Sequence, residues 1–297
     1  MHEVYRRFLP SGLRVEPPRR VSTWWRWRGT DVHVERIGDP AAPERAVVLH
    51  GAGGHAALMW PYAALAAARG IHVVVPDLPG YGRTRVADRS AIRYPDWVDM
   101  VCALTSAERE AHDGPLHLVG ASMGGMLAYE AATRVGGVDR LIVTCLLDPR
   151  DVDARRTAAR HPWLGAVAGP LLRLAAGPLA GAPVPLRWLT DMGAIANDPE
   201  LVDVVLADRR GGGNRMPLGF FRSFFESAPA VEPEAATGPH VVLAHPAADR
   251  WTPAELSLRF FDRIAASKEY VPLEAAGHFP IESPGAERFA ALLTPTR

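Results

Sequence analysis

The hydrophobic positions of the chain follow two patterns that alternate along most of its length. Continuous apolar runs, such as residues 46–49 and 73–76, are typical of strands that are buried on both faces of a parallel sheet. Between these runs, longer segments carry apolar residues at helical spacing. Strands that alternate with helices predict an α/β fold with a mostly parallel central sheet flanked by helices. The predicted strands are 46–50, 71–77, 116–121, 141–148, 240–246 and 268–274, and the predicted helices are 56–69, 94–110, 122–135, 253–266 and one that begins near Pro284.

The first forty residues follow neither pattern. Residues 1–20 are rich in Arg and Pro and have no clear period, so we expect an extended arm. In residues 21–38, apolar and polar side chains alternate around a break at Gly29-Thr30-Asp31. This alternation predicts a hairpin of two antiparallel strands.

A long segment without strand alternation interrupts the α/β pattern at residues 150–236. It is too long to be a plain connection between two elements of a compact domain. We therefore predict a core made of residues 1–149 and 237–297, with 150–236 inserted as a helical lid. Helical spacing occurs at 151–160, 162–177, 199–209 and 217–227, and the GGGN sequence at 211–214 predicts a hinge or a mobile turn.

The composition excludes several classes of protein. The 297 residues carry 33 basic and 33 acidic side chains, so the basic excess that is typical of nucleic-acid-binding proteins is missing. The amino terminus has no apolar core of a signal peptide. The longest apolar stretch, 167–189, is broken by two arginines and four prolines, so we predict no membrane span and expect a soluble, cytoplasmic protein. Cys102 and Cys145 lie in apolar surroundings and are predicted to be small core residues.

The first candidate for chemistry is the sequence GASMGG at 120–125. The pattern G-x-S-x-G between a buried strand and a helix places its serine, Ser122, on a tight strand-to-helix turn. Gly120 and Gly124 remove side chains that would clash across that turn. The start of the following helix directs free N–H groups and a positive dipole end toward developing negative charge. The pattern therefore predicts a nucleophilic serine.

A second glycine-rich turn, HGAGGH at 50–55, follows another buried strand. Serine acyl-transfer enzymes with this architecture form the oxyanion hole from the N–H of the residue after the nucleophile, here Met123, and from an N–H of such a loop, for which Ala52 is the best candidate. Gly53 and His55 are candidates for contacts with substrate. The loop lacks the Lys-Ser/Thr pair of a phosphate-binding P-loop, and we expect His50 to be a structural histidine.

A serine hydroxyl needs an adjacent base that is oriented by a third group. His278 follows the last predicted strand, and Asp249 follows the strand before it, just before a helix that starts near Thr252-Pro253. Ser122, Asp249 and His278 thus occur in the order expected for this architecture, each at the carboxyl end of a strand. Asp148 is a competing candidate for the acid. The sequence has no histidine pair at helical i, i+4 spacing and no CxxC, so we predict neither a metal nor a cofactor.

Together these pieces resemble the α/β-hydrolase family, in particular its lidded group of monoacylglycerol lipases, carboxylesterases and proline iminopeptidases. The matching segments are HGAGGH (50–55), DLPGYGRT (77–84), GASMGG (120–125), ADRWTP (248–253) and AGHFPIESPG (276–285). The resemblance implies an α/β-hydrolase fold with Ser122 as nucleophile, His278 as base, Asp249 as acid, and Ala52 and Met123 as the oxyanion hole.

The expected activity is hydrolysis of a small, largely apolar carboxylic ester by a Ser-His-Asp acyl-enzyme mechanism. The lid is rich in aromatic and aliphatic residues, among which Trp163 and Phe221 are candidates for lining the substrate pocket. An amidase or aminopeptidase could use the same triad. So could a carbon–carbon bond hydrolase acting on a dienoic acid, for which Arg209, Arg210 and Arg215 could bind the carboxylate. A small-molecule receptor that keeps the fold is the non-enzyme alternative.

Overall fold

The central element of the molecule is a sheet of eight strands, seen in a computed structural model that describes residues 2–17, 19–163 and 177–296. The strands are β1 (Arg20–Trp27), β2 (Thr30–Ile37), β3 (Glu44–Leu49), β4 (Ile71–Pro76), β5 (Leu116–Gly120), β6 (Arg140–Val143), β9 (His240–Pro246) and β10 (Lys268–Leu273). Their order in the sheet is β1-β2-β4-β3-β5-β6-β9-β10. The hairpin β1–β2 and the pair β2–β4 are antiparallel, and all other pairs are parallel. The predicted sheet and the predicted hairpin are confirmed.

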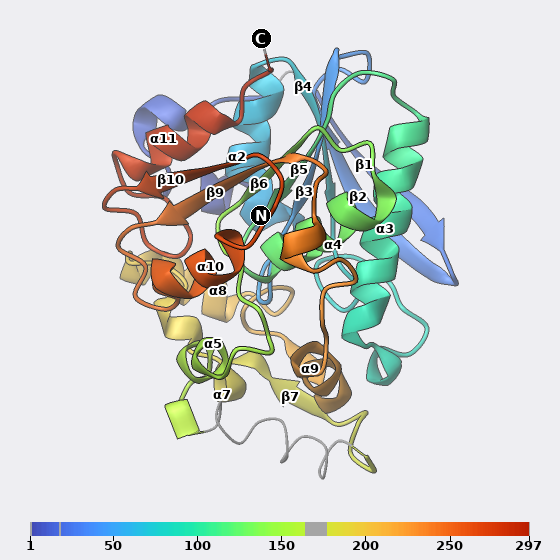
Figure 1. Ribbon diagram of the computed structural model, residues 1–297, viewed down its shortest axis with the longest axis vertical. Helices are drawn as coiled ribbons and strands as arrows, with labels where there is room; N and C mark the ends of the chain where they lie inside the picture. The colour runs from blue at the N-terminus through green and yellow to red at the C-terminus, as the bar shows by residue number, and fades with distance from the viewer. Residues whose placement is uncertain (1, 18, 164–176, 297) are drawn as a thin grey trace.

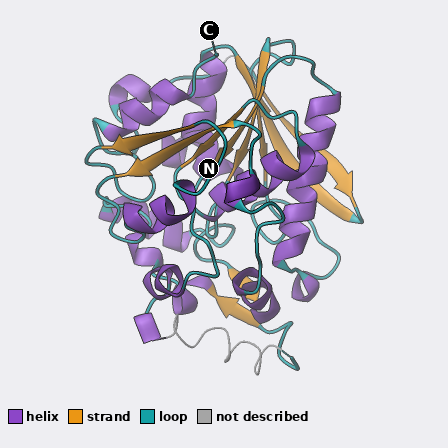
Figure 2. Ribbon diagram, viewed as in Figure 1, coloured by secondary structure: helices purple, strands orange, loops and turns teal. Residues whose placement is uncertain are grey.

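Helices cover both faces of this sheet (Figures 1 and 2). They are α2 (Ala56–Ala68), α3 (Tyr94–Glu110), α4 (Met123–Val135), α10 (Ala254–Phe261) and α11 (Gly285–Leu292). Helix α2 contacts α11, and α3 packs along α4. Every residue of β3, β4 and β5 is buried, because helices cover each strand on both sides. The apolar runs in the sequence therefore do correspond to doubly covered strands.

The amino-terminal segment differs from the extended arm that we expected. It forms a short helix, α1 (His2–Arg6), which packs on α2, followed by a 3₁₀ turn at Ser11–Leu13. Tyr5, Leu9 and Leu13 are buried. These residues recur every fourth position, a helical spacing that the surrounding arginines and prolines obscure. Burial of three apolar side chains stabilises the docked conformation against an extended one.

Two predicted elements of the core are much shorter than expected. The strand predicted at 141–148 ends at Val143, because the following residues leave the sheet and pack against the start of α4. The helix predicted at 253–266 ends at Phe261. Both predictions followed apolar patterns, and an apolar pattern does not distinguish a buried strand from a buried loop.

The chain between β6 and β9, residues 150–236, is called the lid segment below. It contains the helices α5 (Val152–Ala158), α7 (Leu186–Leu189), α8 (Pro199–Ala207) and α9 (Leu218–Phe225). Of these, α5, α7 and α9 lie together beyond one edge of the sheet (Figure 1). It also contains two strands that the sequence did not predict, β7 (Pro183–Pro185) and β8 (Arg215–Pro217), which pair antiparallel. Each has only three residues, too few to show an alternating pattern. Most of the helix predicted at 162–177 lies outside the described residues.

The turn at 211–214, which we predicted to be a hinge or a mobile turn, packs against the core. Asn214 is buried, and its side-chain amide donates a hydrogen bond of 2.7 Å to the carbonyl oxygen of Gly80 in the core. The Cα of Gly212 lies 3.4 Å from the position that a Cβ on Gly53 would take. The glycines therefore allow close packing of this turn against the core.

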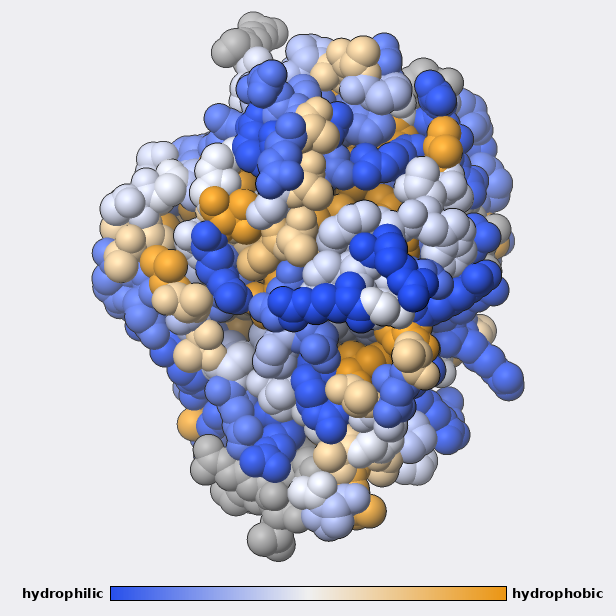
Figure 3. Space-filling view, turned by 90° about the vertical axis from the view of Figure 1, so that its right-hand side faces the viewer, coloured by the Kyte–Doolittle hydropathy of each residue, from blue (hydrophilic) through white to orange (hydrophobic). Residues whose placement is uncertain are grey.

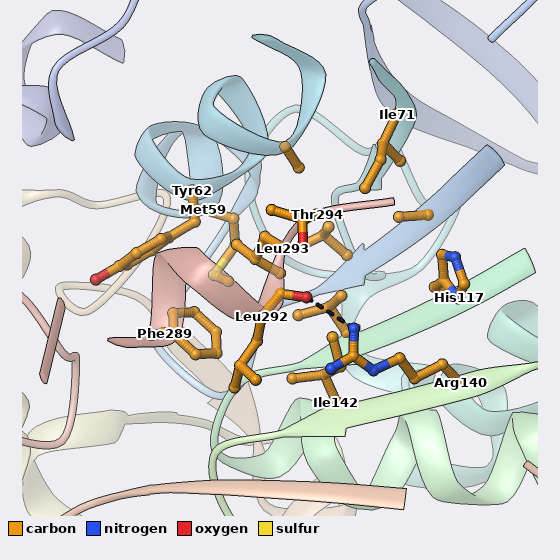
Figure 4. Close-up of a pocket in the computed structure, with 14 residues that line it drawn as sticks. Met59, Tyr62, Ile71, His117, Arg140, Ile142, Phe289, Leu292, Leu293 and Thr294 are labelled. Carbon is orange, nitrogen blue, oxygen red and sulfur yellow. Dashed lines mark hydrogen bonds between the residues drawn. The ribbon is translucent and has the colours of Figure 1, made fainter. Parts of the chain in front are cut away.

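A small apolar pocket of about 20 Å³ lies between α2, α11 and the sheet (Figure 4). The Arg140 guanidinium at its border donates a hydrogen bond of 3.0 Å to the carbonyl oxygen of Leu292. Ile71 and Arg140 are the first residues of β4 and β6, so the pocket lies toward the amino ends of the strands. It is a gap in core packing at the sheet edge opposite to the candidate catalytic residues. The outer face on the side of β1, β2 and α3 is mostly hydrophilic, with scattered apolar patches (Figure 3).

Candidate active site

Ser122 lies on a strained turn between β5 and α4. Its backbone φ is 54° and its ψ is −127°, a conformation that is costly for a residue with a Cβ. A Cβ on Gly120 would overlap the carbonyl oxygen of Gly124, and a Cβ on Gly124 would come within 2.5 Å of the carbonyl oxygen of Leu49. Both glycines of the G-x-S-x-G pattern are thus required by the close approach of the backbone. The surrounding packing holds the serine in its strained conformation.

The loop after β3 packs directly against this turn. A Cβ on Gly51 would lie 3.0 Å from the backbone nitrogen of Met123 and 3.0 Å from the Cβ of Ser122. Met123 is the first residue of α4, and Ser122 does not cap the helix with its side chain. Within the described residues, no acceptor is hydrogen-bonded to the N–H of Met123 or of Ala52. These are the two N–H groups that the sequence predicts for an oxyanion hole.

His50 fixes the shape of this loop. Its Nδ1–H donates to the carbonyl oxygen of Gly51 at 2.8 Å, and its Nε2 accepts a hydrogen bond of 3.0 Å from the N–H of Leu78. The ring is fully buried, and burial lowers the pKa of His50 to about 4. A neutral imidazole with both nitrogens in use matches the structural role that we expected for it.

Asp249 and His278 form a hydrogen-bonded pair. Oδ2 of Asp249 lies 2.8 Å from Nδ1 of His278, and the two side chains are 2% and 3% exposed. The same carboxylate accepts hydrogen bonds from the backbone N–H groups of Trp251 and Thr252 and from the Thr252 hydroxyl, at 2.8, 3.0 and 2.8 Å. Burial by itself would raise the pKa of Asp249, but the hydrogen bond and charge of His278, with the bonds from Thr252, hold that pKa below its ordinary value.

This arrangement sets the tautomer of His278. Because an ionised carboxylate only accepts hydrogen bonds, Nδ1 of His278 carries the proton and Nε2 carries the lone pair. Nε2 is buried and has no hydrogen-bond partner among the described residues. The imidazole therefore has one nitrogen fixed by Asp249 and one nitrogen free to take a proton.

No hydrogen bond joins Ser122 to His278 in the described structure, but a chain of contacts connects their surroundings. The Ser122 N–H donates to Oγ1 of Thr144 at 3.1 Å, just after β6. The next residue, Cys145, has its Sγ 3.9 Å from Oγ1 of Thr252, and that hydroxyl contacts Nδ1 of His278 at 3.2 Å. Catalytic hydrogen bonds in ligand-free enzymes are often long and shorten when substrate binds.

Sequence reasoning did not identify Thr252 and Trp251 as parts of the site. The Trp251 ring packs on the His278 imidazole with ring centroids 4.7 Å apart, and its indole N–H donates to the carbonyl oxygen of Ala158 in the lid segment. Their position two and three residues after Asp249 was the available signal, because a short turn after a carboxylate supplies the N–H donors that hold it.

The competing acid, Asp148, has other partners. Its carboxylate receives hydrogen bonds from the Arg150 guanidinium at 2.8–3.1 Å. Asp249 is the carboxylate that is hydrogen-bonded to the His278 imidazole, and Asp148 is held by a surface arginine.

Part of the lid segment covers the loops that carry these residues. Met192 has its Cε 2.5 Å from the position that a Cβ on Gly53 would take. The carbonyl oxygen of Ile195 accepts a hydrogen bond from the N–H of Phe279, and the Asn197 amide donates to the carbonyl oxygen of Ala248, both at 3.0 Å. Residues 192–197 therefore contact the loops of Gly53, Asp249 and His278 together.

The four candidates for substrate contacts lie in different surroundings. Gly53 is at the contact with Met192. His55 caps α2, and its two ring nitrogens bond to the Ala57 N–H and to Oδ2 of Asp208 in the lid segment. Phe221 is 2% exposed and packs against Phe220, whereas Trp163 is 62% exposed. Gly53 and His55 belong to the proposed oxyanion loop itself, whereas Phe221 is buried against Phe220 and Trp163 is exposed.

The part of the chain that the structure describes contains neither a candidate metal site nor a candidate membrane span. No group of three or more His, Cys, Asp or Glu side chains there could hold a metal ion. No helix there is long and apolar enough to cross a membrane.

Comparison with known proteins identifies the family. The model of the alpha/beta hydrolase family matches residues 46–292, which is most of the chain. The chain belongs to this family. It matches no curated protein.

Solved structures support the same fold for this alpha/beta hydrolase. A soluble variant of the monoglyceride lipase of Saccharomyces cerevisiae, in complex with a substrate analogue, has a TM-score of 0.75 at 15% identity, over 97% of this chain and 99% of that one. The monoacylglycerol lipase of Paleococcus ferrophilus has a TM-score of 0.67 at 18% identity, over 88% and 96% of the two chains. A thermophilic esterase from Thermogutta terrifontis has a TM-score of 0.57 at 21% identity, over 93% and 96%. The protein is an alpha/beta hydrolase whose structural neighbours include lipases and esterases.

Proposed function

We propose that this hydrolase cleaves the carboxylic esters of small, largely apolar molecules through an acyl-enzyme intermediate. The observation that carries the proposal is the hydrogen bond of 2.8 Å between Asp249 and His278. It fixes Nδ1 of a buried imidazole and leaves Nε2 without a partner in the described structure. Ser122 occupies a strained turn at the same edge of the sheet. A base oriented by a carboxylate, at the same edge of the sheet as a half-buried serine turn, is the arrangement we expect to activate the hydroxyl nucleophile.

In the proposed first step, Oγ of Ser122 attacks the ester carbonyl carbon while Nε2 of His278 takes the hydroxyl proton. Asp249 stabilises the imidazolium that forms. The N–H groups of Met123 and Ala52 would bind the negative oxygen of the tetrahedral intermediate, a contribution worth about 10²–10³ in rate for each donor. When the carbon–oxygen bond to the alcohol breaks, His278 gives the proton to the leaving alkoxide.

In the second step, a water molecule loses its proton to Nε2 of His278 and attacks the acyl-enzyme. The bond between the acyl carbon and Ser122 Oγ then breaks, and the imidazolium returns the proton to the serine. The acid leaves and the resting enzyme is restored. No redox change is required.

The preference for an apolar substrate is supported by one side chain of the lid segment and one of the loop after β9. Met192 lies over Gly53 of the proposed oxyanion loop, and Trp251 covers one face of the His278 ring. Both are apolar surfaces that exclude water from the reacting groups, which strengthens the electrostatic interactions within the site. Monoacylglycerol lipases and an esterase among the structural neighbours support the same substrate class.

The test is a panel of p-nitrophenyl acetate, butyrate and octanoate with the full-length protein. We expect the wild type to hydrolyse at least one ester and Ser122→Ala to lose at least about 10³-fold in kcat, because the nucleophile is gone. Ser267→Ala, an exposed serine before β10, is the matched control and should retain wild-type activity.

A fluorophosphonate probe gives an independent readout of the nucleophile. We expect covalent labelling at Ser122 in the wild type and in Ser267→Ala, and none in Ser122→Ala. A folded wild-type protein that neither turns over any of these esters nor reacts with the probe would refute the proposal.

A further inference from the structure

A cleft in the lid segment carries an unusual concentration of positive charge. It has a volume of about 620 Å³ and lies beside the β7–β8 pair, on the side of the molecule where β7 and α7 are seen in Figure 1. Its lining includes Arg89 from the core and Arg187, Arg209 and Arg215 from three different parts of the lid segment. None of the described residues that line the cleft is acidic.

One of these arginines is held rigidly. The guanidinium of Arg89 donates to the carbonyl oxygen of Gly80 at 2.9 Å and to Oδ1 of Asn214 at 3.1 Å. The Asn214 amide also donates to Gly80, and its Oδ1 accepts from the N–H of Arg215. A buried asparagine thus joins the core, the turn at 211–214 and β8 at the wall of the cleft.

In the described part of the chain, the other three guanidinium groups have no hydrogen-bond or ion-pair partner. Arg187, Arg209 and Arg215 make no side-chain hydrogen bond and no ion pair within the described part of the chain. The sequence at 164–176 contains no Asp or Glu, so that stretch supplies no carboxylate either. By contrast, other exposed arginines of the lid segment, such as Arg150 and Arg222, are paired with nearby carboxylates.

Several unpaired like charges around one cleft repel each other, and a bound anion would relieve that repulsion. Each guanidinium is a planar fork that binds phosphate or carboxylate oxygens in pairs. A monocarboxylate occupies one such fork, whereas a diphosphate presents enough oxygens and charge for several. The volume also leaves room for an organic group attached to the phosphate.

We propose that this cleft, lined by Arg89, Arg187, Arg209 and Arg215, binds the diphosphate group of a small molecule. The site is separate from the catalytic residues but adjoins the proposed oxyanion loop. Gly212 lines the cleft, and its Cα lies 3.4 Å from the position that a Cβ on Gly53 would take. Binding here does not require that the protein hydrolyse esters.

The experiment measures binding of inorganic diphosphate to the full-length protein by calorimetry, at fixed ionic strength. We expect saturable binding to the wild type and to Ser122→Ala, so the result is independent of the proposed catalysis. Arg209→Gln and Arg215→Gln should each raise Kd about tenfold, which corresponds to about 1.4 kcal/mol. Arg209→Lys should raise it less, because the charge remains while the fork is lost.

The matched control is Arg156→Gln, an exposed arginine of α5 in the same lid segment but outside the cleft. It should leave Kd unchanged. Thermal unfolding of each variant checks that it is folded, and diphosphate should raise the unfolding temperature of the wild type but much less that of Arg209→Gln.

Two further ligands define the chemistry. Acetate at matched ionic strength should bind at least tenfold more weakly than diphosphate. ADP tests whether the natural ligand is an organic diphosphate or the free anion. If ADP binds more tightly than inorganic diphosphate, the ligand is an organic diphosphate, and if ADP binds more weakly, the ligand is the free anion. No saturable binding of either, equal Kd for Arg209→Gln and Arg156→Gln, or equal binding of acetate would overturn the proposal.

Discussion

Asp208 connects the lid segment to the core, and its replacement by Asn provides the most quantitative prediction. Its Oδ2 accepts hydrogen bonds from the Tyr5 hydroxyl at 2.9 Å and from Nε2 of His55 at 2.8 Å, and its Oδ1 accepts one from the N–H of Arg210 at 2.9 Å. Asp208→Asn keeps the shape of the side chain and removes the negative charge that these donors stabilise. Because both carboxylate oxygens accept hydrogen bonds, the change also replaces one acceptor oxygen by an NH2 group and so loses at least one of these hydrogen bonds.

The size of the effect follows from the pKa of the group. Partial burial would raise the pKa of Asp208, but the hydrogen bond and charge of His55 outweigh it, and with the contributions of Arg210 and Tyr5 the pKa falls from 3.8 to about 2. Since each pKa unit is worth about 1.4 kcal/mol, the carboxylate contributes at most about 2.5 kcal/mol to folding at pH 7. Its side chain is 12% exposed, so screening by water reduces this to about 1–2 kcal/mol.

The sign of the pH dependence is also determined. A carboxyl group with a lowered folded-state pKa stabilises the protein above its unfolded pKa, and this contribution disappears as the pH falls through the folded pKa. Urea unfolding followed by tryptophan fluorescence should therefore show Asp208→Asn about 1–2 kcal/mol less stable than the wild type at pH 7 and pH 5. The difference should fall to about half at pH 3.

Asp203→Asn is the matched control, because Asp203 is an exposed residue on α8 in the same part of the lid segment. Its effect should stay within about 0.5 kcal/mol at every pH. A stability of Asp208→Asn equal to the wild type at pH 7, or a loss that does not change between pH 7 and pH 3, would refute the reasoning.

Three further predictions concern the candidate active site. Asp249→Asn should lower kcat for a p-nitrophenyl ester about 10³–10⁴-fold with little change in KM, because an amide does not hold the Nδ1–H tautomer of His278 as a carboxylate does; equal activity would exclude Asp249 as the acid. Thr252→Val should lower kcat about fivefold to tenfold by removing one hydrogen bond to that carboxylate, measured against Thr296→Val at the far end of the chain, and an unchanged kcat would contradict it. Gly124→Ala should destabilise the protein by more than about 3 kcal/mol in urea unfolding, because its Cβ would meet the carbonyl oxygen of Leu49, whereas Gly238→Ala, with no atom within 4 Å, should cost less than about 1 kcal/mol.

Most of the core fold could be predicted from local patterns. Apolar runs identified β3, β4, β5 and β9 because strands covered on both faces are apolar at most positions. The same reasoning failed at residues 144–148, which have left the sheet although 144–146 are buried. It also failed at Tyr5, Leu9 and Leu13, whose helical spacing is hidden among charged residues. A local apolar pattern indicates that a segment is buried, but it does not indicate whether that segment is a strand, a helix or a loop.

The lid segment was the least predictable part of the molecule. The pair β7–β8 joins residues about thirty positions apart in three-residue strands, and no local periodicity signals such a pairing. The turn at 211–214 is rich in glycine, which suggested mobility. In the structure these glycines allow close contact with Val205 and Gly53, and Asn214 fixes the turn to Gly80.

The sequence by itself determined the family and the succession of core strands and helices along the chain. It also identified Ser122, Asp249 and His278, each of which follows a strand. It could do so because a strained serine turn and a glycine-rich loop depend on residues that are adjacent in the chain. Only the tertiary structure decided which carboxylate meets His278, that Thr252 and Trp251 surround that pair, and that Arg89 joins three arginines of the lid segment in one cleft. These residues come from separate parts of the chain and meet only when the loops fold. The geometry of the loops depends on tertiary packing, which a local sequence pattern does not describe.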